Sequence, residues 1–225
     1  MNAPRVLVAT RPADAALGRF AANRVIRNTY WLLALTLALS ALVAGAASAL
    51  GLPHPGLLIT LVGYFGLLYL TTRYRDSAAG LAFVFALTGF MGYTLGPIVS
   101  TYLALPNGHQ IVMTAMGGTA AVFLALSGYA LVSRRDFSFL GGFLFAGILV
   151  AFLGGLAAIF LALPALSLAV SAAFVLLMAG LILFETSRLV SGGETNYIMA
   201  TVSLFVAIYN LFLSLLSLLG FASND

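Results

Sequence analysis

Seven apolar runs dominate the sequence, and each is close to the roughly 20 residues that a helix needs to cross the hydrocarbon core of a bilayer. Only 7% of the residues are charged, compared with about 25% in an ordinary soluble domain. The pattern predicts an all-α integral membrane protein with seven transmembrane helices. The predicted spans cover residues 29–51, 56–72, 78–102, 109–133, 137–161, 165–190 and 196–221.

The ten basic residues are all arginines, and they avoid the centres of the apolar runs. They lie before the first run, or in and beside the loops that follow the second, fourth and sixth runs. The other three loops contain none. Because basic residues near membrane spans mark the cytoplasmic side, we expect a cytoplasmic N-terminus and a periplasmic C-terminus that ends at Asp225.

Residues 1–28 are polar and contain Pro4, Pro12 and Gly18, so we expect a flexible cytoplasmic tail. A seven-helix transmembrane domain follows at 29–221, with a short periplasmic end at 222–225. The arginines of the tail suit contact with anionic headgroups of the lipid bilayer. The tail has one aromatic residue, Phe20, and lacks the set of aromatic partners and the folded frame that nucleic-acid binding uses, so we expect no nucleic-acid partner.

Glu185 is the only acidic residue flanked by a long apolar run. An ionised carboxylate inside lipid costs at least a few kcal/mol and usually faces a partner or a water-filled path. Gly192 and Gly193 predict the end of its helix, where the helix dipole also disfavours an anion. Arg188 lies three residues further on, at a spacing that brings both side chains to one face. Glu185 and Arg188 are therefore candidates for an ion path or a pH-sensing site.

The last apolar run carries small and polar residues at spacings of four, three, four and three. At about 100° per residue these positions form one narrow stripe on a helix. The stripe favours close packing with hydrogen bonds between helices. The alternative is a polar path shared with Glu185, for which Ser203 and Asn210 are the candidates. The stripe consists of Ser203, Ala207, Asn210, Ser214 and Ser217.

The third run contains a GxxxG pair, Gly92 and Gly96, followed directly by Pro97. Small residues at this spacing let two membrane helices approach closely. Proline lacks an amide and leaves a carbonyl of the preceding turn unpaired, which favours a kink. We interpret these residues, together with Gly192 and Gly193, as helix-packing or hinge positions.

The chain has no cysteine, which excludes disulfides and thiolate metal sites. Its two histidines, His54 and His109, lie in loops without a third ligand. HExxH zinc motifs, glycine-rich phosphate loops and a plausible Ser-His-Asp set are absent from the sequence. We therefore expect neither an enzyme nor a cofactor or bound metal, and we consider calcium only as a transported ion.

Three long strings resemble the Bax-inhibitor family of membrane proteins, in particular its bacterial YccA branch. They are TGFMGYTLGPIVSTYL at 88–103, SFLGGFLFAGI at 138–148 and FETSRLVSGGETNYIMATVSLFVAIYNLF at 184–212. The resemblance implies a seven-helix fold in which the last helix runs through the middle of the other six.

The resemblance implies two alternative functions. The YccA branch is similar to a partner and modulator of the membrane-anchored ATP-dependent protease FtsH, in membrane-protein quality control at the bacterial inner membrane. Other members resemble pH-sensitive calcium leak channels closed by a pair of carboxylates. Glu185 matches the first carboxylate of that pair, whereas Ala207 stands at the second position. We therefore favour modulation of FtsH, with the leak channel as the alternative.

Overall fold

The computed structural model describes residues 12–223, with 12–22 described by their backbone alone. These residues form seven α-helices joined by short loops, and the part of the chain that is described contains no strand. The all-α fold predicted from the sequence is confirmed. The helices are α1 (Pro12–Ala49), α2 (Leu57–Arg73), α3 (Ala78–Leu103), α4 (Gly108–Ser133), α5 (Leu140–Phe160), α6 (Pro164–Ser191) and α7 (Tyr197–Ala222).

The first helix begins at Pro12, so the prediction of a flexible tail through residue 28 is wrong for residues 12–28. Proline is tolerated in the first turn of a helix, where its missing amide would have no partner anyway. The segment that follows is rich in alanine, the best helix former, which outweighs the single glycine at position 18. Residues 1–11 of the expected tail lie outside the described residues, as do 224 and 225 of the expected periplasmic end.

Six of the helices are long and apolar enough to cross a membrane, and α2 is a shorter apolar helix of 17 residues. At about 1.5 Å per residue α2 is roughly 25 Å long, which places it at the lower limit for a span. In α1, residues 23–49 alone are long and apolar enough to cross a membrane.

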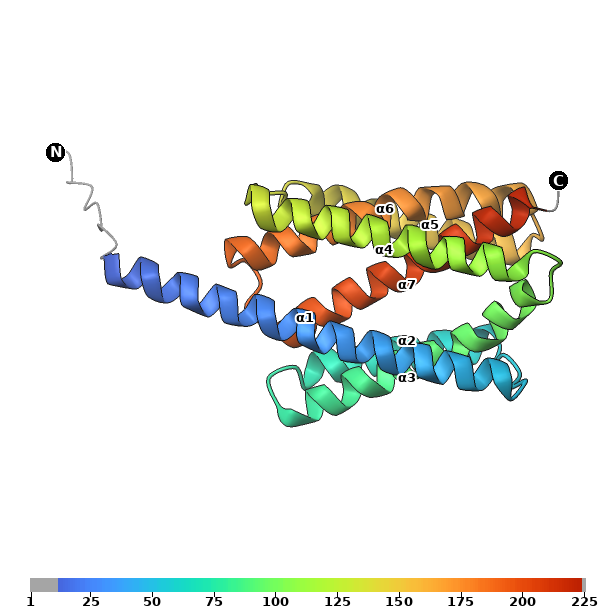
Figure 1. Ribbon diagram of the computed structural model, residues 1–225, viewed down its shortest axis with the longest axis horizontal. Helices are drawn as coiled ribbons and strands as arrows, with labels where there is room; N and C mark the ends of the chain where they lie inside the picture. Colours follow the sequence, from blue (N-terminus) through green and yellow to red (C-terminus); the bar gives the residue numbers. More distant parts are fainter. Residues whose placement is uncertain (1–11, 224–225) are drawn as a thin grey trace.

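The last helix runs through the middle of the bundle, as expected. In Figure 1, α1, α2 and α3 lie on one side of α7, and α4, α5 and α6 lie on the other. α7 packs against α1, α3, α4 and α6. Half of its most apolar segment is buried, a larger share than in any of the other five membrane-length helices. The core of the protein is therefore built around α7.

Successive helices run in opposite directions, so the loops gather in two sets (Figure 1). Loops 74–77, 134–139 and 192–196 lie at one end, which we call the arginine end. It carries all the arginines whose side chains the structure describes. Loops 50–56, 104–107 and 161–163 lie at the opposite end, where the Asn107 amide donates a hydrogen bond to Ser223.

Candidate functional site at the end of α6

α6 ends at a residue in the left-handed backbone conformation. Gly192 has φ 75°, a conformation that glycine adopts without a steric penalty. The backbone amides of Gly193 and Glu194 then donate to the Arg188 carbonyl at 2.9 and 3.2 Å. This turn reverses the chain within a few residues and brings Glu194 back beside the last turns of α6.

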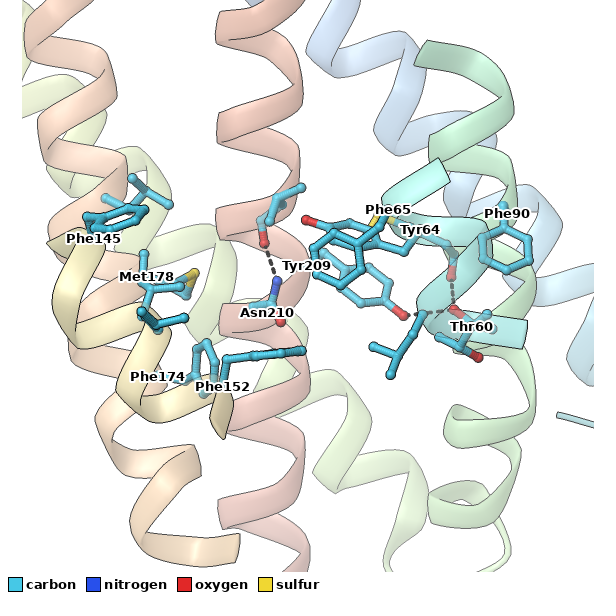
Figure 2. A pocket seen from close by; sticks show the side chains of 17 residues that line it. Thr60, Tyr64, Phe65, Phe90, Phe145, Phe152, Phe174, Met178, Tyr209 and Asn210 are labelled. Carbon is cyan, nitrogen blue, oxygen red and sulfur yellow. Dashed lines mark hydrogen bonds between the residues drawn. The ribbon is translucent and has the colours of Figure 1, made fainter. Parts of the chain in front are cut away.

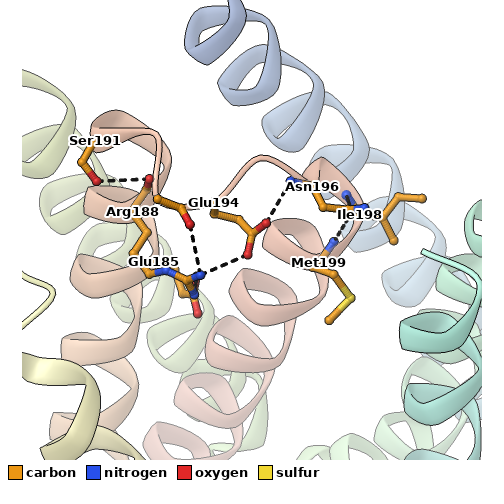
Figure 3. Close-up of polar contacts among 8 residues, drawn as sticks. Glu185, Arg188, Ser191, Glu194, Asn196, Ile198 and Met199 are labelled. Atoms are coloured by element: carbon orange, nitrogen blue, oxygen red, sulfur yellow. Dashed lines mark hydrogen bonds and ion pairs between the residues drawn. The ribbon is translucent and has the colours of Figure 1, made fainter. Parts of the chain in front are cut away.

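Arg188 lies between two carboxylates (Figure 3). Its Nη1 donates to Glu185 Oε2 at 3.5 Å, and its Nη2 donates to Glu194 Oε2 at 3.2 Å. The side chain of Glu185 is only 7% exposed, that of Glu194 18% and that of Arg188 32%. The guanidinium also lies over the Phe184 ring, 5.5 Å from its centre. The buried charge of Glu185 is therefore balanced by a cation from its own helix.

The polar contacts continue from this cluster to the start of α7 and to loop 74–77. Glu194 Oε1 accepts a hydrogen bond from the backbone amide of Asn196 at 2.8 Å. The Asn196 Oδ1 caps α7 by accepting from Ile198 N and Met199 N. Its Nδ2 donates to Arg75 O at 3.2 Å and to Asp76 Oδ1 at 2.7 Å. One asparagine thus joins two loops of the arginine end.

Ser203 and Asn210, the two candidates on the α7 stripe, lie in different places. Ser203 lies near the carboxyl group of Glu185. Asn210 donates to its own helix, from Nδ2 to Val206 O at 2.9 Å, and lines a cavity that Glu185 does not reach. Further along the stripe, Ser171 donates to Ser217 at 3.2 Å, which joins α6 to α7. The structure therefore does not bring Asn210 and Glu185 together in one path.

Ala207 is fully buried among apolar side chains. Its cluster includes Met178 and Ile182 of α6, and Ile182 precedes Glu185 by about one turn. A methyl group in this apolar layer offers no group that shares a proton with Glu185. The roles of Glu185, Arg188, Ser203 and Asn210 in an ion path or pH sensing stay predictions.

Sequence reasoning missed two hydroxyls that follow Glu185 on α6. The Thr186 hydroxyl is fully buried, 3.2 Å from that of Ser127 on α4 and 3.5 Å from that of Tyr30 on α1. The Ser187 hydroxyl accepts from Phe137 N and donates to Arg135 O, which ties loop 134–139 to α6. The signal was present, because Glu-Thr-Ser-Arg is an unusually polar string for the end of an apolar run.

The GxxxG pair lies against α1. A Cβ atom added to Gly92 would lie 2.4 Å from the Ser40 carbonyl oxygen, and one added to Gly96 would lie 2.7 Å from that of Ala44. The backbones of α1 and α3 therefore approach so closely that only glycine fits. α3 continues as a helix through Pro97, and the nearby Thr94 hydroxyl donates to Met91 O at 2.8 Å.

Among residues 23–223, whose side chains the structure describes, no group of three or more histidine, aspartate or glutamate side chains is arranged to hold a metal ion. The site at the arginine end is instead an ion cluster of one guanidinium and two carboxylates that fixes the turn between α6 and α7. The six membrane-length helices and the central α7 define a polytopic helical membrane protein with an ion cluster at the turn between α6 and α7.

Comparison with known proteins identifies the family. A family model described as inhibitor of apoptosis-promoting Bax1 matches residues 22–224. The chain therefore belongs to the Bax-inhibitor family, and the resemblance seen in the sequence is confirmed.

This chain is similar to several known proteins over almost its whole length. It is 57% identical over 203 residues to the modulator of FtsH protease YccA of Escherichia coli strain K12, covering 90% of this chain and 92% of that protein. The same identity and coverage relate it to the inner membrane protein YccA of Escherichia coli O6:H1. It is also 53% identical over 201 residues to an uncharacterized protein of Pseudomonas aeruginosa, covering 89% of this chain and 90% of that one.

Proposed function

We propose that this chain binds the membrane-anchored protease FtsH and modulates its action on membrane proteins. One observation carries the proposal: the 57% identity to a protein named as a modulator of FtsH, over nearly the full length of both chains. The place of action is the bacterial inner membrane, as the name of a second relative states for that protein.

We further propose that the arginine end faces the cytoplasm. Arginines beside the membrane spans favour that side, and the first turns of α1 project past the other helices there (Figure 1). At about 1.5 Å per residue the 38 residues of α1 are roughly 57 Å long, against a hydrocarbon core of about 30 Å. The projecting turns therefore supply a contact for a cytoplasmic part of the protease. This contact adds to those between the membrane spans of the two proteins.

Calcium leak is the second candidate function, because a nearly buried carboxylate lies at the end of a membrane helix beside the Ser203 hydroxyl. We place it second because the carboxyl group of Glu185 is paired with Arg188 and Ala207 supplies no second acid. A shared proton between two like charges, which makes a carboxylate pair an effective switch, has no counterpart on α7 here.

Copurification and degradation assays test the leading proposal. The tagged chain is extracted in mild detergent from cells that contain FtsH, and an equally abundant tagged seven-helix protein of another family serves as the control. We expect FtsH to copurify with this chain and not with the control protein. We also expect purified FtsH in liposomes to degrade a membrane substrate at a changed rate when the chain is added. Absence of FtsH from the purified material, together with an unchanged rate, would contradict the proposal.

A reporter fusion tests the orientation. A reporter inserted in loop 134–139 is expected to be cytoplasmic, and one fused after Asp225 periplasmic. A cytoplasmic reporter after Asp225 would mean that one of the seven helices, with the short α2 as the first candidate, does not cross the membrane.

A further inference from the structure

A cavity of about 400 Å³ lies within the membrane part of the bundle, separate from the ion cluster at the arginine end. It is bounded by α2 and α3 on one side, α5 and α6 on the other, and α7 between them (Figure 2). Neither Glu185 nor Arg188 lines it. Seven of its 17 lining residues are aromatic, namely Tyr64, Phe65, Phe90, Phe145, Phe152, Phe174 and Tyr209.

Two polar side chains in this apolar cavity keep free hydrogen-bonding capacity. Asn210 uses one amide hydrogen for Val206 O at 2.9 Å, which leaves its second hydrogen and its oxygen. The Tyr64 hydroxyl makes no hydrogen bond to the other residues drawn in Figure 2. By contrast, the Tyr209 hydroxyl is paired with Thr94 at 3.0 Å. Polar groups inside a membrane protein are costly unless something pairs with them.

The lining defines the chemistry of an occupant. No charged side chain lines the cavity, so the occupant is neutral, because a charge transferred there would be unbalanced. The phenyl rings offer flat surfaces that stack against another ring or meet its edge. Tyr64 and Asn210 both offer donors, which match carbonyl acceptors at the edge of the occupant. A mostly apolar pocket of a few hundred Å³ with few polar groups is the usual form of a small-molecule site.

Between α2 and α5, lining side chains of the cavity are exposed on the outside of the bundle. The rings of Phe65 on α2 and Phe152 on α5 meet edge to face at 6.1 Å between their centres. Phe65, Phe145 and Leu149, which also line the cavity, are each about half exposed or more. These side chains form a rim that faces the bilayer, so a membrane-dissolved molecule reaches the cavity without crossing either end of the bundle.

We propose that this cavity binds a neutral, membrane-soluble molecule with a flat ring that carries carbonyl oxygens, the chemistry of a quinone head group. The ring lies among the phenyl groups of α5 and α6, and its carbonyl oxygens accept hydrogen bonds from Tyr64 and Asn210. The cavity is too small for a partner helix, since a span about 30 Å long and 10 Å wide occupies several times its volume. The site is independent of the contact proposed for FtsH.

Direct binding of ubiquinone-1 to the purified full-length chain in detergent tests the proposal. Prenylbenzene, which has a ring and tail without the carbonyl oxygens, is the matched ligand control. We expect ubiquinone-1 to bind and prenylbenzene to bind at least tenfold more weakly. Equal binding of both would overturn the proposal, because the cavity would then only accommodate a hydrocarbon chain. Absence of saturable ubiquinone-1 binding would overturn it as well.

Variants locate the site. Tyr64→Phe and Asn210→Leu each remove one donor and are expected to weaken binding about threefold to tenfold, the range for one hydrogen bond. Thr119→Val is the control, because Thr119 lines a different cavity and donates to its own helix at Ala115 O. Thermal unfolding of each variant without ligand separates lost binding from lost folding. Unchanged affinity in both folded variants would overturn the assignment.

Discussion

Two polar side chains inside the bundle, Glu185 and Asn210, have opposite surroundings. Glu185 is almost fully buried, and its charge is balanced by Arg188 three residues further along the same helix. Asn210 keeps part of its hydrogen-bonding capacity open toward an aromatic cavity. The difference follows from charge. An unbalanced ion in an apolar interior costs several kcal/mol, whereas a partly satisfied amide costs far less.

The two regions also differ in their expected roles, since one stabilises the fold and the other is the proposed binding site. Glu185, Arg188 and Glu194 form a closed cluster that holds the turn between α6 and α7. Asn210 and Tyr64 line the aromatic cavity. We therefore expect substitutions in the first region to affect stability, and substitutions in the second to affect ligand binding with little loss of stability.

The largest effect is expected for Arg188→Leu, which leaves Glu185 buried without its cation. Breaking a buried pair costs about 3–5 kcal/mol, and the partial exposure of Arg188 places the loss near the lower limit. Denaturant unfolding in micelles or bicelles measures it. The double variant Glu185→Gln with Arg188→Leu should recover part of the loss, because no buried charge remains. A single variant as stable as the unchanged protein would show that water, rather than Arg188, compensates Glu185.

A smaller loss is expected for Asn196→Ala, which removes the cap of α7 and the link to loop 74–77. Loss of an N-cap costs about 0.5–2 kcal/mol. Hydrogen exchange should rise at the amides of Ile198 and Met199 before it rises in the middle of α7. Asn107→Ala is a comparable change at the opposite end and should leave those amides protected. Equal protection of the two amides in Asn196→Ala and in the unchanged protein would contradict the role of this cap.

The smallest effect on stability is expected for Asn210→Leu. Its amide bonds only to its own helix, and leucine fits the apolar lining, so the free energy of unfolding should change by less than about 1 kcal/mol. Unfolding under the conditions used for Arg188→Leu gives the direct comparison. A loss as large as that of Arg188→Leu would mean that Asn210 is a structural residue and that the two regions do not differ.

The sequence predicted the helices well because each apolar run has the length of a span and ends at glycine, proline or charged residues. It also predicted the contact of Glu185 with Arg188, since that contact depends only on helical spacing. It did not predict Glu194 and Asn196 as partners, because their positions depend on the left-handed turn at Gly192. The cavity beside Asn210 was beyond sequence reasoning for a similar reason. Its walls come from five helices that meet only in the folded bundle.

The start of α1 shows the limit of local signals. A proline and a glycine suggested a break, but alanine-rich sequence on both sides continues the helix from Pro12. Single residues of low helix propensity are thus weaker evidence than the composition of a whole window.

Ion flux is the most direct test of the central claim. The claim is that Glu185 belongs to a structural ion pair and that the protein acts by binding FtsH rather than by conducting ions. Purified protein is placed in liposomes loaded with a calcium dye, and uptake is followed from about pH 6 to pH 8 for the unchanged protein and for Glu185→Gln. We predict little flux and no steep pH dependence in either. A strong leak in the unchanged protein that changes steeply with pH and disappears in Glu185→Gln would contradict the claim and make the leak channel the leading function.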